Sequence, residues 1–446
     1  MELYYGNNYY KLYHGSMLDM LEVIEPNTIS SIVTDPPYEL NFMGKGWDNA
    51  GVSFNSDTWK KCYDVLKPGG YLLAFGGSRT FHRIACAIED AGFEIRDTIM
   101  WLYGSGFPKS MNVGLAIDKK NGVESKVIGY EKGTMPDFRD VGKKQKELSG
   151  VDKLTFGQIE NSERKQQPIY EPQNEWKGWG TALKPAFEPI IVARKPFKGT
   201  LVDNVLENKT GAINIDECRV ELQENETIAI NVDYTQTKQS DMGWGTNKCI
   251  TEQGTQGRFP ANVILSYDQI TFDEVCGGFP VTNKPNGSIT KNYKINNQVY
   301  SDYGYCNTWE AYQDSGSACR YFYCAKASKK DRDNGLDEFE EKRKAGYGYD
   351  LGYGNAGEGM FKDRQTLKKN THPTVKPTTL MQYLVRLVTP KGGIVLDPFN
   401  GSGSTGKATM YENNERNANY KYIGIELTEE YLPISRARIN YAICDR

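Results

Sequence analysis

Short apolar runs alternate with stretches of helical periodicity near the amino terminus. The runs at 29–34, 71–75 and 93–102 are rich in β-branched and aromatic residues, which predicts buried strands. The stretches at 58–66 and 78–91 place apolar residues on one helical face. We expect this alternation to build a parallel sheet covered by helices.

Three local signals predict where these elements begin and end. Asp57 is expected to cap the first helix, because its carboxylate can accept from the free N–H groups of the first turn. The sequence Lys67-Pro68-Gly69-Gly70 is expected to break the chain before the next strand. Gly92 is expected to end the second helix.

The same alternation returns near the carboxyl terminus. Leucines at 380, 384 and 387 predict a helix over 376–388. A strand at 393–396, a glycine loop, a helix over about 405–413 and a strand at 422–425 are expected to follow. Thr428, with two acidic residues after it, is expected to open a last helix.

The middle of the chain is more polar. We expect a polar loop over 104–184, followed by a strand at 188–193. Residues 198–370 are rich in Asn, Gly, Thr and Tyr, with short strand-like pieces at 261–265 and 320–325. A chain of 446 residues is long enough for two domains, or for one domain with a large insertion.

Charge alone does not identify a partner. The formal net charge of −3 argues against a basic surface over the whole chain. Basic clusters at 143–146, 326–332 and 362–369 could still contact nucleic acid, although such runs are more often solvated surface.

Metal binding and secretion are both disfavoured. The nine cysteines form no C-x-x-C pair and the chain has three histidines, so we expect no metal site and a reducing compartment. No segment approaches the roughly 18 apolar residues of a membrane span, and the first residues lack a signal-peptide pattern. We therefore expect a cytoplasmic protein without membrane contact.

The glycine loop Gly401-Ser402-Gly403-Ser404-Thr405-Gly406-Lys407-Ala408 admits two interpretations. A phosphate loop has the pattern G-x-x-x-x-G-K-[ST], and the last position must supply a hydroxyl to magnesium. Ala408 has no oxygen, which argues against a P-loop nucleotide hydrolase. Glycines before a helix can equally bring backbone N–H groups close to another anionic ligand.

The sequence Asp35-Pro36-Pro37-Tyr38 follows a predicted strand, where α/β proteins place their ligands. Its chemistry suits an exocyclic amino group of a base, whose lone pair is delocalised into the ring. The Asp35 carboxylate and the Pro36 carbonyl can accept from the two N–H groups and localise that lone pair. Proline offers no competing N–H donor, and Tyr38 can stack on a base removed from the duplex.

These motifs, with His372-Pro373-Thr374-Val375-Lys376-Pro377 and Glu426, resemble those of the β-class DNA amino-methyltransferases, whose motifs are circularly permuted. The resemblance covers about 1–110, 185–197 and 370–442. A looser similarity to a phage- and prophage-type subgroup lies at 257–263 and 321–327. One departure is Ser16, which stands where the family often has Asp.

The resemblance implies a Rossmann-like α/β methyltransferase fold that binds S-adenosylmethionine. Its sheet would be mixed, mostly parallel, seven-stranded and circularly permuted. Residues 1–197 would form the catalytic part of the methyltransferase domain and 371–446 its S-adenosylmethionine-binding part. Residues 198–370 would form an inserted target-recognition region.

The resemblance also implies roles for individual residues. The catalytic residues would be Asp35, Pro36, Pro37 and Tyr38. Cofactor contacts would come from Asp35, Thr374, Lys376, Asp397, Pro398, Phe399, Gly401, Ser402, Gly403, Ser404 and Glu426. Glu426 would accept from the ribose hydroxyls, whereas Lys407 would point to solvent or pack within its helix, and a structural role is at least as plausible for His372. Contacts to DNA could come from Trp244, Arg258, Tyr303, Tyr305, Trp309 and Arg332, although each alone is more often structural.

The implied reaction is direct methyl transfer to adenine N6 of a flipped base in double-stranded DNA, with no covalent enzyme intermediate. Cytosine N4 is the main alternative, and the D-P-P-Y motif favours adenine in this class. An inactive DNA-binding relative, a P-loop hydrolase and a methylase of amides or RNA are weaker alternatives. A homodimer and a separate restriction endonuclease remain open as partners.

Overall fold

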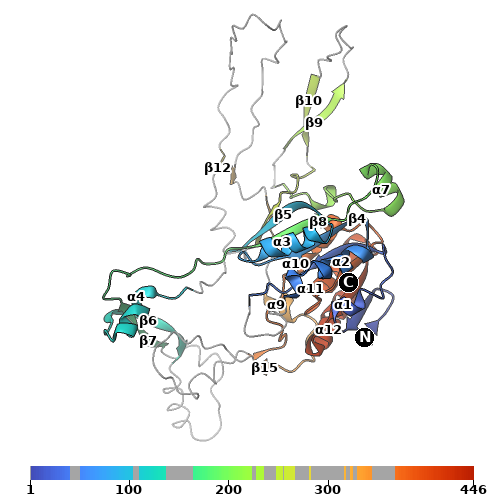
Figure 1. The fold of residues 1–446 in the computed structure, drawn as a ribbon. Coiled ribbons are helices and arrows are strands. Elements are labelled where there is room, and N and C mark those ends of the chain that lie inside the picture. The colour runs from blue at the N-terminus through green and yellow to red at the C-terminus, as the bar shows by residue number, and fades with distance from the viewer. Residues whose placement is uncertain are drawn as a thin grey trace, which may run out of the picture. The chain divides into compact units, whose positions relative to one another are not determined.

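The computed structural model describes residues 2–40, 51–103, 110–136, 164–222, 228–235, 248–254, 256–266, 281–282, 316–317, 322–324, 329–343 and 367–445. The chain divides into two compact units. The first consists of Met1–Ser105, Ala186–Lys344 and Gln365–Arg446, and the second of Gly106–Pro185 and Ala345–Arg364. Elements from the two ends of the chain therefore share one unit (Figure 1).

One mixed sheet of ten strands organises the first unit. Its strands, in spatial order, are β1 (Glu2–Gly6), β2 (Tyr10–His14), β18 (Lys421–Glu426), β17 (Ile394–Asp397), β3 (Ile29–Thr34), β4 (Leu66–Phe75), β8 (Phe187–Arg194), β5 (Glu94–Tyr103), β11 (Val263–Ser266) and β14 (Tyr323–Cys324). Neighbours pair in parallel, except that β1 is antiparallel to β2 and that β8 is antiparallel to both β4 and β5.

The predicted mixed, mostly parallel α/β sheet is confirmed, but seven was too few strands for the described residues. The sheet is wider because β1 extends one edge as a hairpin with β2. At the other edge β11 and β14 pair beyond β5, and both overlap the pieces that the sequence marks as strand-like.

Helices cover both faces, as the alternation of buried side chains requires. Ile32 and Leu72 face a core formed with α1 (Met17–Met20), α2 (Ser56–Val65) and α3 (Phe81–Asp90). Val33 and Leu73 face the opposite core. It is formed with α10 (Thr378–Val388), α11 (Ser404–Arg416) and α12 (Leu432–Cys444).

Other described elements are smaller. They are η3 (Val52–Phe54), α7 (Leu201–Asn208), η4 (Asp216–Cys218), α9 (Lys329–Asp333), η6 (Glu429–Tyr431) and the strand pairs β9–β10 (Ile228–Thr235, Lys248–Gly254), β12–β13 (Val281–Thr282, Gly316–Ser317) and β15–β16 (Lys342–Arg343, Leu367–Lys368). Within the described ranges, no helix is long and apolar enough to cross a membrane.

Two boundary predictions are wrong. The cap of α2 is Asn55 rather than Asp57, because the Asn55 side chain accepts from the Asp57 N–H at 2.9 Å. The expected breaker at 67–70 lies inside β4, which begins at Leu66. The stretch is irregular, since Gly69 has a φ of 78° and the pairing with β3 jumps from Leu66 to Tyr71. Gly69 and Gly70 nevertheless exchange hydrogen bonds of 2.9 Å with Lys195, just after β8, which keeps the stretch in the sheet.

The second unit corrects the expectation of a polar loop over 104–184. Part of this stretch forms α4 (Val113–Asn121) and the hairpin β6–β7 (Lys126–Pro136, Arg164–Glu171). The buried carboxylate of Asp118 holds these pieces together. It accepts from the Gln173 N–H at 2.8 Å, the Asn174 amide at 2.6 Å and the Ser125 hydroxyl at 2.9 Å.

Lys195 joins β8 to the end of α2 and supports the sheet. Its ammonium donates to the carbonyls of Tyr63 and Leu66, both at 2.7 Å, and to the Asn27 side chain at 2.8 Å. A cation at this place satisfies carbonyls that the helix leaves without partners.

We expect Lys195→Met to lower the free energy of unfolding by about 2 kcal/mol, because charge-assisted hydrogen bonds are lost while the aliphatic stem still packs. Urea unfolding followed by circular dichroism measures this. The exposed Lys198 provides the matched control, and equal effects of Lys198→Met and Lys195→Met would contradict the assigned role.

Candidate active site

Asp35 leaves the carboxyl end of β3 and meets a lysine from the other end of the chain. Its Oδ2 accepts from Lys376 Nζ at 2.6 Å. Lys376 is 7% exposed and lies just before α10. One buried ion pair thus joins the proline-containing turn after β3 to the segment that leads into α10.

Glu188, at the start of β8, completes this group and was missed by the sequence interpretation. Its Oε2 accepts from the Tyr38 hydroxyl at 2.8 Å and lies 3.4 Å from Lys376 Nζ. Its Oε1 accepts from the Tyr103 hydroxyl at 3.3 Å. The sequence signal that could have indicated Glu188 is its charge at the start of a mostly apolar strand.

One ammonium therefore serves two carboxylates. Burial alone would lower the pKa of Lys376, but the charges of Asp35 and Glu188 outweigh it and raise that pKa. Burial raises the pKa of Asp35, and Glu188 adds to this while Lys376 opposes it. The Lys376 ammonium also lies 5.0 Å from the centre of the Phe75 ring and 5.3 Å from that of Tyr38, so it stays charged in an otherwise apolar setting.

The second oxygen of Asp35 is available to a ligand. Asp35 Oδ1 is buried and has no hydrogen-bond partner among the described residues. Buried acceptors are normally satisfied, so an orphaned one beside a structured ion pair calls for an external donor.

Asp397, at the end of β17, holds the glycine loop to the neighbouring strand. Its Oδ1 accepts from the Thr34 hydroxyl at 2.6 Å and the Phe399 N–H at 3.1 Å, and its Oδ2 from the Thr405 hydroxyl at 2.7 Å. Burial raises the pKa of this carboxyl to about 6, against the effect of those donors. Both oxygens are thus used within the protein, and Asp397 shapes the loop.

Two glycines in the loop are required by space and backbone conformation. Gly401 and Gly403 have φ angles of 52° and 74°. A Cβ on Gly401 would lie 2.8 Å from His372 Nε2, and one on Gly403 would lie 2.5 Å from Ser435 Oγ. No larger residue fits this cradle without displacing its neighbours.

Glu426, at the end of β18, closes the other side of the loop. Its Oε2 accepts from the Gly401 N–H at 2.6 Å and its Oε1 from the Thr428 N–H at 2.7 Å. The residue is 7% exposed, and burial raises its pKa to about 7. Each oxygen keeps a further lone pair for a hydroxyl donor.

The serines of the loop are held by an arginine that the sequence interpretation missed. Arg438 Nη1 donates to the Ser402 carbonyl at 2.7 Å and to the hydroxyls of Ser402 and Ser404 at 2.9 and 3.2 Å. The prediction that Lys407 could point to solvent is wrong, because Lys407 is fully buried and its Nζ pairs with Asp331 at 2.7 Å.

Residues 372 and 374 lie beside the loop. The His372 ring packs edge-on against Tyr431 with centroids 4.6 Å apart, and its Nδ1 accepts from the Thr374 N–H at 3.3 Å. Thr374 itself is exposed.

The side chain of Ser16 caps α1 by accepting from the Leu18 N–H at 3.2 Å, so its visible contact is structural.

Several expected DNA contacts are corrected or lie outside the described residues. Arg258 is 5% exposed, and the half-buried Arg332 donates to the His372 carbonyl at 2.5 Å, which favours the structural alternative for both. Trp244, Tyr303, Tyr305 and Trp309 lie outside the described residues.

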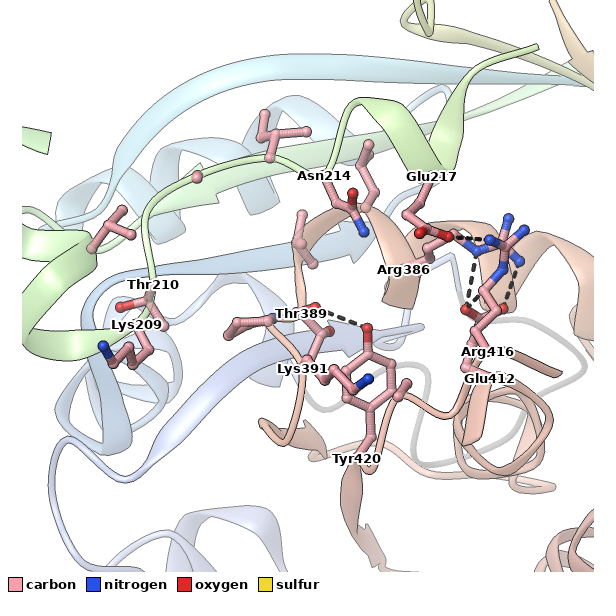
Figure 2. Close-up of a pocket in the computed structure, with 17 residues that line it drawn as sticks. Lys209, Thr210, Asn214, Glu217, Arg386, Thr389, Lys391, Glu412, Arg416 and Tyr420 are labelled. Carbon is pink, nitrogen blue, oxygen red and sulfur yellow. Dashed lines mark hydrogen bonds and ion pairs between the residues drawn. The ribbon is translucent and has the colours of Figure 1, made fainter. Parts of the chain in front are cut away.

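A cavity of about 380 Å³ lies at the opposite end of the strands (Figure 2). It is lined by Thr389 and Tyr420, which precede β17 and β18, and by the paired side chains Arg386 and Glu412. The Tyr420 hydroxyl donates to the Thr389 carbonyl at 2.9 Å. Asp35, Gly401 and Glu426 do not line this cavity, so it is separate from the candidate site.

A methyl-donor cofactor fits the other end. The glycine cradle, the Glu426 carboxylate and the orphaned Asp35 oxygen belong to neighbouring strands, since β3, β17 and β18 are adjacent. In an open α/β sheet ligands bind at the carboxyl ends of such strands. Among the described residues, no group of three or more His, Cys, Asp or Glu side chains is arranged to hold a metal ion.

The fold and this site define a Rossmann-like methyltransferase. Residues 29–437 match the model of the DNA methylase family of N6 and N4 enzymes, and the chain belongs to that family.

Individual relatives are distant or match over short stretches. The chain is 21% identical to the type II methyltransferase M.HindIII of Haemophilus influenzae over 248 residues, which are 46% of this chain and 64% of the relative. It is 37% identical to the DNA adenine methyltransferase YhdJ of Escherichia coli over 71 residues, 16% and 22% of the two chains. The matches thus span less than two thirds of either curated relative.

One of the solved structures that this chain matches is the PvuII DNA methyltransferase, described as cytosine-N4-specific. It covers 98% of this chain and 90% of its own, with 13% identity and a TM-score of 0.41.

The raised pKa of Glu426 gives a prediction about stability and pH. The carboxyl binds its proton more tightly in the folded state, with a pKa of about 7 against a usual 4.5. The contribution of Glu426 to stability is therefore greatest below pH 4.5 and is lost as the pH rises through 7. We expect the free energy of unfolding of the wild type, minus that of Glu426→Gln, to fall by about 3 kcal/mol between pH 4 and pH 8.

Chemical unfolding at a series of pH values measures this difference. A constant offset between the two proteins reflects the amide itself. The charge of Asp397 contributes to the raised pKa of Glu426, so the difference includes this interaction. A difference that stays flat, or that rises with pH, would rule out a buried ionising Glu426.

Proposed function

We propose that this protein is an S-adenosylmethionine-dependent, site-specific DNA methyltransferase that methylates adenine N6 in double-stranded DNA. The observation that carries the proposal is the Asp35 carboxylate, with one oxygen held by Lys376 at 2.6 Å and the other buried without a partner beside the glycine cradle. Membership in the DNA methylase family supports the same reaction.

The proposed chemistry at Asp35 is hydrogen-bond acceptance. Asp35 Oδ1 and the Pro36 carbonyl would accept from the two N–H groups of the target amine and hold its lone pair out of the ring. Lys376 neutralises Asp35 and fixes its orientation, so the acceptor is positioned before the base arrives. The raised pKa of Asp35 makes the same carboxylate a better acceptor for the proton that the methylated amine loses.

Tyr38 is proposed to stack on the flipped base, with Pro36 and Pro37 setting the turn. Its hydroxyl is tied to Glu188 at 2.8 Å, which fixes the plane of the ring. Stacking offsets part of the cost of removing a base from the duplex.

The cofactor would be held by residues of the two carboxyl-terminal strands. Glu426 would accept from ribose hydroxyls, the cradle of Gly401, Ser402, Gly403 and Ser404 would meet the methionine end, and Pro398 and Phe399 would line the path between them. When bound, S-adenosylmethionine supplies a sulfonium methyl group. Thr374 and Lys376 remain proposed neighbours of the cofactor, and the 198–370 segment remains the proposed target-recognition region.

Adenine is favoured over cytosine by the D-P-P-Y sequence and by the similarity to an enzyme named a DNA adenine methyltransferase. A homodimer and a partner endonuclease also belong to this proposal as open questions. Oligomeric state and cleavage can be measured on the same preparations.

We expect Asp35→Asn to reduce methyl transfer by roughly 10²-fold or more, because the new amide presents an N–H donor where the target amine needs an acceptor. The assay transfers labelled methyl groups to unmethylated genomic DNA and then separates the nucleosides. Calorimetry measures cofactor affinity in parallel, because Asp35 is also expected to contact the cofactor, and the loss of transfer should persist at saturating cofactor. Asp90→Asn is the matched control, since Asp90 is exposed at the end of α3.

Label in N6-methyladenine supports the proposal in full. Label in N4-methylcytosine would keep the mechanism and overturn the base. Cofactor binding without any label in DNA would overturn the substrate and direct attention to RNA, to a protein amide or to a binding role.

Glu188→Gln tests the positioning of Tyr38. Loss of the carboxylate leaves Lys376 paired with Asp35 alone and weakens the hold on the Tyr38 hydroxyl. We expect kcat to fall about tenfold, since small displacements at the reacting centre are costly. Glu89→Gln on the exposed face of α3 is the control, and an unchanged kcat for Glu188→Gln would remove Glu188 from the site.

A further inference from the structure

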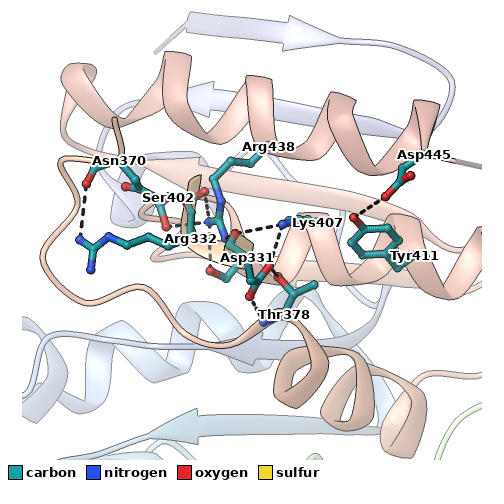
Figure 3. A network of polar contacts seen from close by, with 10 residues as sticks. Asp331, Arg332, Asn370, Thr378, Ser402, Lys407, Tyr411, Arg438 and Asp445 are labelled. Atoms are coloured by element: carbon teal, nitrogen blue, oxygen red, sulfur yellow. Dashed lines mark hydrogen bonds and ion pairs between the residues drawn. The ribbon is translucent and has the colours of Figure 1, made fainter. Parts of the chain in front are cut away.

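A short helix from the middle of the chain reaches under the glycine loop. This helix is α9 (Lys329–Asp333), which lies in the 198–370 segment. Figure 3 shows its Asp331 and Arg332 among side chains of α10, α11 and α12. The sequence interpretation gave this basic stretch as solvated surface or as a DNA contact, but these two side chains contact the protein.

Asp331 binds the helices on both sides of the loop. Its Oδ1 pairs with Lys407 Nζ of α11 at 2.7 Å. Its Oδ2 accepts from the Thr378 N–H at 2.8 Å, and its Oδ1 from the Thr378 hydroxyl at 2.5 Å. One carboxylate thus joins the start of α10, just after Lys376, to the first turns of α11.

Arg438 continues the contact into the loop itself. This residue is fully buried in α12, and its Nη2 donates to the Asp331 carbonyl at 3.4 Å. Its Nη1 donates hydrogen bonds to the carbonyl and the hydroxyl of Ser402. The chain of contacts therefore runs from α9 through Arg438 to the cradle.

Arg332 holds the segment that carries Lys376. Its Nη2 donates to the carbonyls of His372 and Asn370 at 2.5 and 3.4 Å. The fully buried Asn370 returns a hydrogen bond of 2.9 Å from its amide to the Arg332 carbonyl, and its N–H donates to Asp333 at 3.2 Å. The backbone of 370–372 is thus fixed by α9 on both sides.

The charges make Asp331 hard to replace. Two fully buried cations, Lys407 and Arg438, lie beside this one carboxylate. A buried charge that loses its partner is strongly unfavourable. Burial would raise the pKa of Asp331, but Lys407 and the hydrogen bonds from Lys407 and Thr378 outweigh it and lower that pKa. Asp331 therefore remains ionised near neutral pH.

We propose that Asp331 and Arg332 are positioning residues through which the middle segment controls the affinity of the site for its cofactor. They touch neither of the proposed substrates, and they act through Arg438, Lys407 and the 370–376 backbone. The inference rests on the proposed function, because the ligand concerned is S-adenosylmethionine. It assigns to part of the 198–370 segment a role other than reading DNA.

The test measures cofactor binding and turnover separately. Calorimetry with S-adenosylmethionine and no DNA should show Asp331→Asn and Arg332→Met binding at least about tenfold more weakly than wild type. At saturating cofactor, kcat should return to within about threefold of wild type, so the defect lies in KM for the cofactor. Asp337→Asn, the same change at a side chain that is 90% exposed just beyond α9, should bind like wild type.

Folding is controlled by a second variant. Arg438→Lys keeps the buried charge but cannot reach all three acceptors in the loop. It should weaken cofactor binding while the circular dichroism spectrum stays that of the wild type. If Asp331→Asn fails to fold, Arg332→Met and Arg438→Lys decide the matter by the same measurements.

The outcomes separate the two proposals. Wild type that does not bind S-adenosylmethionine would overturn the proposed function itself. Wild type that binds, with folded variants binding equally well, would overturn only the positioning role. Variants that lose kcat at saturating cofactor without a change in its KM would also overturn it.

Discussion

The ammonium of Lys376, buried between the carboxylates of Asp35 and Glu188, is the interaction on which the rest of the site depends. Without it, two acidic side chains would lie close together in a low-dielectric setting and one would take up a proton. With it, Asp35 keeps one oxygen fixed, while the other is buried without a hydrogen-bond partner among the described residues. The aromatic rings of Phe75 and Tyr38 lie beside the same ammonium, so packing and charge fix one geometry.

The second requirement is a loop that is rigid although it is rich in glycine. Asp397 fastens its start to β3, Arg438 fastens its serines to α12, and Glu426 accepts from its backbone. Each of these groups is buried, so each contact replaces water that the loop would otherwise bind. A pre-shaped cradle loses less conformational entropy when a ligand enters it.

The candidate site residues that the sequence predicted are those that are local in the chain. Asp35 to Tyr38 and the glycine loop follow apolar strands, and Glu426 is the last residue of one. Strand ends are where such folds place ligands. The mixed sheet could be anticipated for the same reason, because β-branched runs and helical faces alternate at both ends. The extra edge strands are short or form a hairpin, and periodicity alone did not assign them to the sheet.

The remainder could not be read locally, because its partners are far apart in sequence. Glu188 contacts Tyr38 and Lys376, and Asp331 pairs with Lys407. The helical pattern alone did not decide whether Lys407 faces solvent or the protein. The breaker at 67–70 does not end the strand for the same reason: hydrogen bonds to Lys195, more than a hundred residues later, hold that irregular stretch in the sheet.

The adjacency of β3 and β17 has a consequence for how the protein is made. These neighbours in the sheet are separated by most of the chain, so during synthesis β3 emerges from the ribosome long before the strand that pairs with it. Until then, one side of β3 lacks a hydrogen-bonding partner, and such an edge can pair with other chains. Closing so long a loop is slow, since non-local strand pairing limits folding rates. We therefore expect the nascent chain to need chaperones that bind the incomplete edge of the sheet. The two halves of the candidate site should form together only after the last strands leave the ribosome.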